Sequence, residues 1–330
     1  MTAPEHIPVL TAELLSIWQA AEGDRLLDAT LGLGGHARAF LEATATGTVF
    51  GIDADPAAAQ EAKQRLASFG ERVTYCIADF NHLKDSVHGG GILDQQGFTH
   101  VLFDLGLGSH QLADPKRGFS FASDGPLQMR YRADSDPPAS SMKALRDLER
   151  RLQRLPDAID IIRGLSADDL SHLIRVYGEE RYARRIAAAL KENLQTGTAR
   201  ETADVVRSAV PAFYERGRID PATRTFQALR IAVNRDLEAL SAALPQAFDV
   251  LLPGGTLSVI SFHSLEDRIV KQFMRAMTAV CICPPEQPQC TCTRSPRAEL
   301  VARRPIRPSP SEILHNPRAR SAKLRALRKR

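Results

Sequence analysis

The apolar positions in the first third of the chain fall into short runs separated by amphipathic stretches. Four runs have the length of buried strands and lie at residues 25–27, 48–52, 72–77 and 99–103. Helical spacing of apolar residues appears at 12–20, with Thr11 as a candidate cap, at 37–42 and at 56–68. Strands that alternate with helices form a parallel sheet. The pattern therefore predicts an α/β fold.

This alternation stops after residue 108 and resumes only after residue 219. Pro137-Pro138 interrupts the intervening segment after a stretch rich in Gly, Asp and Pro. Apolar spacing predicts helices at 166–177, 178–193, 222–244 and 265–277, a strand at 256–261 and a last edge strand at 320–327. We therefore expect a core of residues 1–108 and 220–330, with a helical insertion domain at 109–219 that recognises the substrate.

An aspartate follows each of the first four predicted strands. These residues are Asp28, Asp53, Asp79 and Asp104. In a parallel sheet the carboxyl ends of the strands meet at one edge, and ligands bind outside that edge. Four acids in register therefore predict a binding site there.

The loop after the first predicted strand is rich in glycine. Gly32, Gly34 and Gly35 tolerate positive φ, and the helix that follows them offers free N–H groups. The spacing Gly32-x-Gly34-x-x-Ala37, with Asp53 about 20 residues further on, also fits a loose dinucleotide fingerprint. The loop alone is therefore compatible with a nicotinamide-dependent oxidoreductase and with an S-adenosylmethionine-dependent methyltransferase.

Composition and charge narrow the class of protein. The 330 residues are 43% hydrophobic and 25% charged, which is typical of a globular protein. The sequence has no apolar run of about 20 residues and no secretory signal pattern, so we expect a cytoplasmic protein without a membrane partner. Residues 294–330 contain 12 Lys or Arg against 2 Asp or Glu. This basic segment favours a polyanionic partner, RNA rather than DNA, and a merely solvated tail is the alternative.

Four of the five cysteines lie close together near the C-terminus. Cys281 and Cys283 precede a proline-rich segment, and Cys290 and Cys292 follow it. Four thiolates can bind a structural zinc ion tetrahedrally, and four thiols in a loop are the alternative. Cys76 lies inside a predicted strand and is expected in the core.

Longer motifs stand in a fixed order along the chain. They are GLGGH, DADP, DLGLGSHQ, RGFSF, DGPLQMR, YGEERYARRIA, PATRTFQALRIAVN, LPGGTLSVISFHSLEDRIVK and NPRARSAKLR. Together they closely resemble the ribosomal RNA small-subunit methyltransferase H family, from about residue 6 to residue 325. The resemblance implies a class I S-adenosylmethionine-dependent methyltransferase with a Rossmann-like sheet. It also implies methylation of N4 of a decoding-centre cytidine in 16S ribosomal RNA, either free or in the small subunit.

The resemblance also implies a set of residues that bind S-adenosylmethionine. They are Gly34, Gly35, His36, Asp53, Phe80, Asp104 and Gln111. In this assignment Asp53 holds the ribose, Phe80 lies against adenine, and Asp104 and Gln111 lie near the methionine end. The chain departs from the family at Gly108-Ser109, where two serines are usual, and fits it poorly over 132–165.

Asp104 and His263 are the candidate catalytic residues. The lone pair of a cytosine amino group is delocalised into the ring, so an acceptor for its N–H bonds favours attack on the methyl group. Asp104 has the right chemistry, although binding the ammonium group of the methyl donor is an alternative role. His263, after a later strand, is a second candidate, with a structural role as the alternative.

Arginines on predicted helices are candidates for binding RNA phosphates. Arg181, Arg184 and Arg185 have the i, i+3, i+4 spacing of one helical face, and Arg224 and Arg230 lie on another helix. A solvated face paired with neighbouring glutamates is the alternative. A further hypothesis for the whole chain is a non-catalytic RNA-binding or assembly protein on the same fold.

Overall fold

The computed structural model describes residues 7–89, 97–108, 111–112, 114–131, 137–214, 219–281, 283, 287, 292 and 295–330. The chain divides into two units. The first contains residues 1–106 and 240–330, and the second contains residues 107–239.

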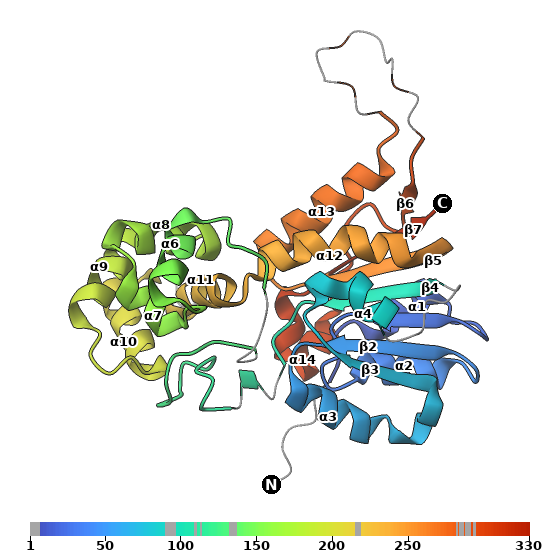
Figure 1. Ribbon diagram of the computed structural model, residues 1–330, viewed down its shortest axis with the longest axis horizontal. Helices are drawn as coiled ribbons and strands as arrows, with labels where there is room; N and C mark the ends of the chain where they lie inside the picture. Colours follow the sequence, from blue (N-terminus) through green and yellow to red (C-terminus); the bar gives the residue numbers. More distant parts are fainter. Residues whose placement is uncertain are drawn as a thin grey trace. The chain divides into compact units, whose positions relative to one another are not determined.

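The first unit contains a seven-stranded sheet in the order β3-β2-β1-β4-β5-β7-β6 (Figure 1). The strands are β1 (Arg25–Asp28), β2 (Thr48–Asp53), β3 (Val73–Ile77), β4 (Phe98–Asp104), β5 (Leu251–Ser261), β6 (Ala298–Leu300) and β7 (Lys323–Lys329). Neighbouring strands from β3 to β5 are parallel, whereas β7 is antiparallel to both β5 and β6. From β1 the chain adds β2 and β3 on one side of that strand and then crosses back to add β4 and β5 on its other side. This reversal of strand order is where open α/β sheets bind ligands.

Helices cover both faces of this sheet. They are α1 (Thr11–Trp18), α2 (Gly35–Ala43), α3 (Pro56–Arg65), α4 (Leu83–Gly89), α12 (Asp236–Val250), α13 (Ser264–Thr278) and α14 (Pro310–His315), with 3₁₀ segments η1 (Ala67–Arg72), η2 (Phe80–His82) and η4 (Pro317–Ser321). Leu26 and Leu102 pack in one apolar cluster with Trp18 of α1. Leu27 and Phe103 pack in a second cluster with residues of α12 and α13. Successive strand residues point to opposite faces, so the two clusters form the two sides of a mostly parallel α/β core.

Helices α1 and α3 begin with different kinds of cap. Thr11 does not cap α1, because Leu10 occupies the cap position with φ 57° and Thr11 Oγ1 instead donates to the carbonyl of Pro8 at 3.3 Å. At α3 the side chain of Asp55 does cap, accepting the Ala57 N–H at 3.0 Å.

The basic C-terminal segment is part of the sheet and not a free tail. Strand β7 pairs with β5 on one side and with β6 on the other, so the prediction of an edge strand at 320–327 is wrong. Strand β6 has only three residues, which is too short for an alternating pattern to reveal it. Residues 317–321 form η4, and the strand itself begins at Lys323.

The second unit is helical. The helices whose bounds are described are α6 (Lys143–Leu152), α7 (Ala158–Gly164), α8 (Ala167–Gly178), α9 (Ala183–Asn193), α10 (Ala199–Ala209) and α11 (Ala222–Asn234). The boundary expected at residue 220 is wrong, because α11 belongs to this unit. The Gln227 side-chain amide donates to the Tyr177 carbonyl of α8 at 2.9 Å. A Cβ at Gly178 would lie 2.5 Å from the Arg224 carbonyl oxygen, so glycine permits the close approach of α8 and α11.

The single helix predicted at 222–244 is two helices. Arg235 separates α11 from α12 in the left-handed conformation, with φ 58°. Its buried guanidinium donates to the Ala232 carbonyl and to a carboxylate oxygen of Glu149. These contacts hold a bend that apolar spacing does not reveal. The helix predicted at 178–193 likewise begins only at Ala183, after Glu179 with φ 51°.

No helix among the described residues is long and apolar enough to cross a membrane.

Candidate active site

The glycine-rich turn connects β1 to α2, as the sequence predicts. Gly32 and Gly34 have positive φ, 53° and 77°, which glycine adopts without strain. The Gly32 N–H donates to Asp53 Oδ2 at 2.7 Å, so the turn is tied to the end of β2. A Cβ at Gly34 would lie 2.8 Å from Leu66 Cδ1, which gives this glycine a packing role in addition to its conformational one.

Gly35 differs from its neighbours. It is the first residue of α2 and does not adopt the positive φ that glycine tolerates. A Cβ at this position would lie 3.0 Å from side-chain carbons of Pro8. Close packing against the segment before α1 is therefore the reason for glycine.

Asp53 organises the turn through both carboxylate oxygens. Besides the bond from Gly32, its Oδ1 accepts the Asp55 N–H at 2.8 Å. A carboxylate oxygen can accept more than one hydrogen bond. The Asp53 side chain therefore supports the loop and still offers acceptor capacity at the end of β2.

Asp104 ends β4 with one carboxylate oxygen that lacks a partner. Its Oδ1 is buried and has no hydrogen-bond partner among the described residues. Its Oδ2 lies 3.8 Å from Nδ1 of His36. Its backbone N–H donates to Thr30 Oγ1 at 2.6 Å, which fixes the end of the strand against the turn. A buried acceptor without a donor is rare and marks a place where a ligand N–H or O–H can bind.

His36 is a buried neighbour of Asp104. Its side chain is only 7% exposed, and Nε2 lies 2.8 Å from the carbonyl oxygen of Val9. A carbonyl accepts, so Nε2 carries a proton and Nδ1 faces the Asp104 carboxylate. Both ring nitrogens therefore face protein groups, and the geometry favours a role for His36 in positioning Asp104.

Several acids crowd the same edge of the sheet. Burial raises the pKa of Asp28 to about 7, while the charge of His36 acts in the opposite direction. Burial also raises the pKa of Asp104. The charge of His36 and the Gly106 N–H lower this pKa, whereas the charge of Glu266 raises it. Shifted carboxylates in one place are typical of functional sites.

His263 caps α13. Its Nδ1 accepts the Glu266 N–H at 3.4 Å, and its Nε2 lies 2.8 Å from Glu266 Oε1. The second carboxylate oxygen of Glu266 accepts the N–H groups of Phe262 and His263, at 2.8 Å and 3.2 Å. Both ring nitrogens of His263 thus engage Glu266, an arrangement that fits the structural alternative better than catalysis.

The remaining predicted cofactor residues are Phe80 and Gln111. Phe80 follows β3 in η2 and packs edge-to-face on Phe103 with ring centroids 5.8 Å apart. Gln111 belongs to the second unit, where its side-chain carbonyl accepts the Gly108 N–H at 3.0 Å. This bond closes a local turn within the DLGLGSHQ motif.

Sequence reasoning did not assign roles to Thr30 and Glu266. Thr30 lies two residues beyond β1, and Glu266 lies at the third position of α13. A glutamate three residues after a helix cap is the signature of a capping box. The Glu266 side chain is also only 3% exposed, and its charge raises the pKa of Asp104. That second role depends on the neighbouring strand and leaves no local signal.

Several of the Lys and Arg residues considered as contacts for RNA phosphates have partners within the protein. Lys323 and Arg325 of β7 pair with Asp267 of α13, so these charges of the basic segment serve the fold. Arg181 precedes α9, so the predicted single helical face with Arg184 and Arg185 is wrong. Instead the Arg181 guanidinium lies over the rings of Tyr182 and Tyr214.

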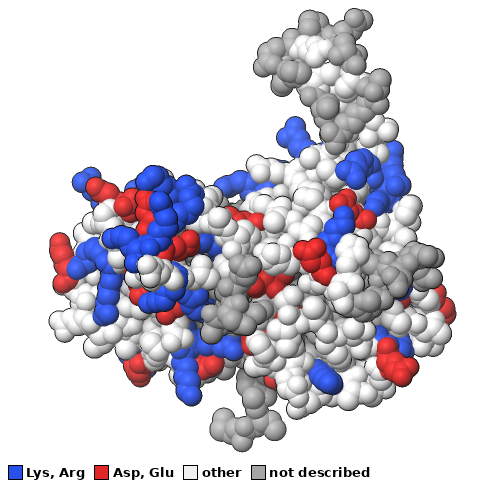
Figure 2. All heavy atoms as spheres, in the orientation of Figure 1, with Lys and Arg blue, Asp and Glu red and all other residues white. Residues whose placement is uncertain are grey.

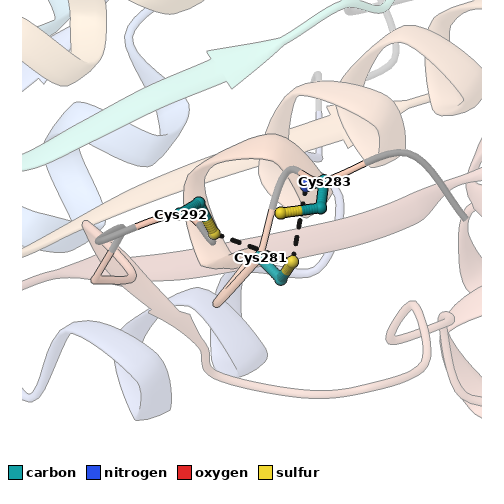
Figure 3. A group of neighbouring side chains, drawn as sticks. All are labelled: Cys281, Cys283 and Cys292. Atoms are coloured by element: carbon teal, nitrogen blue, oxygen red, sulfur yellow. Dashed lines mark hydrogen bonds between the residues drawn. The ribbon is translucent and has the colours of Figure 1, made fainter. Parts of the chain in front are cut away.

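Three of the cysteines predicted to bind zinc lie together. The Sγ atoms of Cys281, Cys283 and Cys292 are all within 4.8 Å of one another (Figure 3). Cys290 lies outside the described residues. Cys76 is in β3 and packs against the core, as expected.

This chain is similar in sequence to proteins of one family. The model of the MraW methylase family matches residues 3–330. A ribosomal RNA small subunit methyltransferase H of Syntrophotalea carbinolica is 44% identical over 98% of both chains. Another of Thermomicrobium roseum is 46% identical over 97% of this chain and 92% of its own. A solved structure of an rRNA methylase from Streptococcus thermophilus covers 95% of this chain and 91% of its own, with 11% identity and a TM-score of 0.38.

Proposed function

The chain belongs to the MraW methylase family, and on that premise we propose that it methylates N4 of a decoding-centre cytidine in 16S ribosomal RNA with S-adenosylmethionine as methyl donor. The relatives named above are small-subunit ribosomal RNA methyltransferases. The observation that carries the assignment of the chemistry is the buried, unpartnered Oδ1 of Asp104 at the carboxyl end of β4.

In this proposal Asp104 accepts a hydrogen bond from the cytosine amino group. When bound, S-adenosylmethionine supplies an activated methyl group on a positively charged sulfur. The lone pair of the cytosine amino group is delocalised, and positive charge develops on this nitrogen as the new bond forms. A carboxylate oxygen that accepts its N–H stabilises that charge in a site shielded from water.

Neighbouring groups keep the Asp104 carboxylate in position. Thr30 holds its backbone, and His36 faces Oδ2 with a ring anchored to the Val9 carbonyl. Oδ1 therefore remains available for substrate or donor. In this arrangement His36 acts through Asp104 and is a positioning residue.

The residues around the turn fit the methyl donor. Asp53 retains acceptor capacity for ribose hydroxyls, and Phe80 offers a half-buried ring beside β3 for the adenine. The glycines of the turn let the backbone approach a ligand closely. We assign Gln111 to the methionine end on the family motif.

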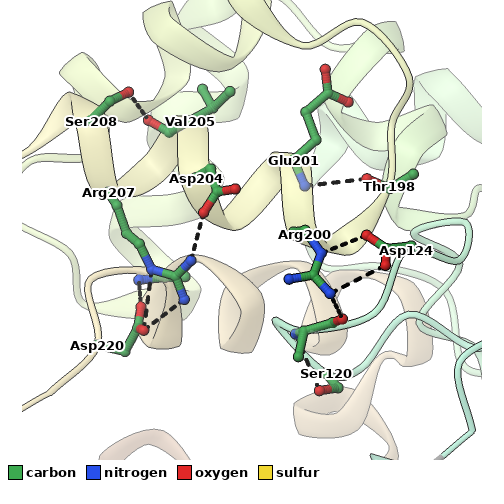
Figure 4. Close-up of polar contacts among 12 residues, drawn as sticks. Ser120, Asp124, Thr198, Arg200, Glu201, Asp204, Val205, Arg207, Ser208 and Asp220 are labelled. Atoms are coloured by element: carbon green, nitrogen blue, oxygen red, sulfur yellow. Dashed lines mark hydrogen bonds and ion pairs between the residues drawn. The ribbon is translucent and has the colours of Figure 1, made fainter.

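The helical second unit is proposed to bind RNA. On the face shown in Figure 2, Lys and Arg are interspersed with Asp and Glu. On α10, Arg200 pairs with Asp124, and Arg207 pairs with Asp204 and Asp220 (Figure 4). These cations are already neutralised within the protein.

Two arginines on α9 lack such neutralisation. Arg184 and Arg185 are exposed and have no ion pair among the described residues. Unneutralised guanidinium groups bind phosphates without first giving up a partner. We therefore assign phosphate contacts to Arg184 and Arg185.

A methyl-transfer assay tests the proposal. The purified chain is incubated with labelled S-adenosylmethionine and either small subunits or 16S rRNA from cells that lack the protein, and the product nucleosides are identified by mass spectrometry. N4-methylcytidine at one decoding-centre position is expected. Label at another atom or in another RNA would overturn the assignment.

Competing functions are separated by binding. Calorimetry with S-adenosylhomocysteine and with NAD distinguishes a methyltransferase from a nicotinamide-dependent oxidoreductase. A duplex DNA of equal length tests the proposed preference for RNA.

Since ribosomal subunits are the proposed substrate, we assign the activity to the cytoplasm, which fractionation of cells will check.

A further inference from the structure

The cysteine cluster, consisting of Cys281, Cys283 and Cys292, is the strongest feature that methyl transfer does not use. It lies in the segment between α13 and β6, and three sulfur atoms converge there (Figure 3). We propose that these three residues bind a structural zinc ion as thiolates. The proposal does not depend on the substrate of the enzyme.

The separation of the sulfur atoms matches a metal site. Zinc binds thiolate sulfur at about 2.3 Å in tetrahedral geometry, so two ligating sulfurs lie about 3.8 Å apart. The Sγ atoms of Cys281 and Cys292 are 3.7 Å apart. A disulfide requires a sulfur–sulfur distance of about 2.05 Å, so these two atoms are not bonded to each other.

A backbone group supports the charged form of one ligand. The Cys283 N–H donates to Cys281 Sγ at 3.4 Å. A hydrogen bond to sulfur favours the thiolate over the thiol and orients the atom toward its neighbours. The C-x-C spacing thus supplies two ligands and one supporting hydrogen bond from three consecutive residues.

The position of the cluster indicates a structural role. The ends of its segment are already tied, because the Arg297 N–H donates to the Met277 carbonyl at 2.9 Å. A metal ion bound by both Cys281 and Cys292 would join the two sides of this segment at a second point, between Met277 and Arg297. Helix α13 begins beside the candidate active site and has 15 residues, so it is about 22 Å long. The cluster follows the far end of this helix, which separates the metal from the chemistry.

Zinc content tests the proposal on the full chain, produced without a metal-binding tag and purified with a thiol reductant. Elemental mass spectrometry is expected to give one zinc ion per chain. Cys281→Ser and Cys292→Ser are expected to lose at least about nine-tenths of it, since each removes a thiolate ligand. Cys76→Ala, which removes a thiol from β3, is the matched control and should retain full zinc content.

Cobalt substitution tests the ligands even if a serine variant fails to fold. The wild-type chain, stripped of zinc and loaded with Co²⁺, should show an intense thiolate-to-cobalt charge-transfer band and the visible bands of tetrahedral cobalt. Absence of zinc and of these bands would overturn the proposal. Iron in place of zinc, a Cys281–Cys292 disulfide in the reduced preparation, or equal zinc loss in Cys76→Ala would overturn it as well.

Discussion

Asp104 Oδ2 lies 3.8 Å from His36 Nδ1, and the opposite nitrogen of the same ring lies 2.8 Å from the Val9 carbonyl oxygen. The imidazole thus connects the segment before α1 to the end of β4. The other carboxylate oxygen of Asp104, Oδ1, is buried and has no hydrogen-bond partner among the described residues.

Asp104→Asn is expected to slow single-turnover methylation about a hundredfold to a thousandfold at saturating donor and RNA. An amide still accepts a hydrogen bond but lacks the charge that stabilises the positive nitrogen, and loss of one such contact costs about 2.7–4 kcal/mol. Because burial raises the pKa of Asp104, removing the charge should not destabilise the fold, which thermal melting will check. Full rescue by excess donor would reduce Asp104 to a binding residue.

Asp53→Ala is expected to weaken binding of the methyl donor about tenfold to a hundredfold, because a charge-assisted hydrogen bond is worth about 1.5–3 kcal/mol. The structure adds a second effect, since the variant also releases the N–H groups of Gly32 and Asp55. Asp53→Asn keeps one acceptor oxygen but turns an amide NH2 toward the other N–H donor, so it retains only one of the two bonds that support the loop. Calorimetry measures the affinity, and unchanged affinity in both variants would place the ribose elsewhere.

Asp28→Asn is expected to stabilise the unliganded chain increasingly as the pH rises. The ordinary pKa of an aspartate is 3.8, and burial raises that of Asp28 to about 7. Between these values the folded chain keeps a proton that the unfolded chain has released, so the stability of the wild type falls as the pH rises. One pKa unit corresponds to about 1.4 kcal/mol, so the advantage of the variant should approach about 4 kcal/mol above pH 7.

Urea unfolding across a pH series measures this effect. Asp249→Asn, whose side chain is 50% exposed in the same unit, is the control and should show no comparable trend. A constant difference between Asp28→Asn and wild type at all pH values would contradict the raised pKa.

Replacing Arg184 and Arg185 together by alanine is expected to weaken RNA binding and reduce its salt dependence. Each lost phosphate contact on single-stranded RNA lowers the slope of log affinity against log salt by about 0.7, so the double variant should lose about 1.4. The control replaces Arg200 and Arg207, whose charges are paired with aspartates, and should leave the slope nearly unchanged. Filter binding across a salt series decides, and equal slopes in both variants would refute the assignment.

The sequence by itself determined the parallel strands and the edge of the sheet at which their aspartates lie. Apolar runs ending in Asp28, Asp53 and Asp104 identify strands because alternation and burial are local properties of a strand, readable from a few residues. The glycine turn and the start of α3 at Pro56 follow equally from local conformational preferences.

Only the tertiary structure decided what each charged group faces. Arg235, which separates α11 from α12, donates a hydrogen bond to Glu149, 86 residues earlier in the chain. Glu266, which forms a capping box with His263, raises the pKa of Asp104 through its charge, and β7 lies inside the sheet because the three-residue strand β6 pairs with it. Such contacts join residues distant in sequence, so no local pattern of hydrophobic and polar positions encodes them.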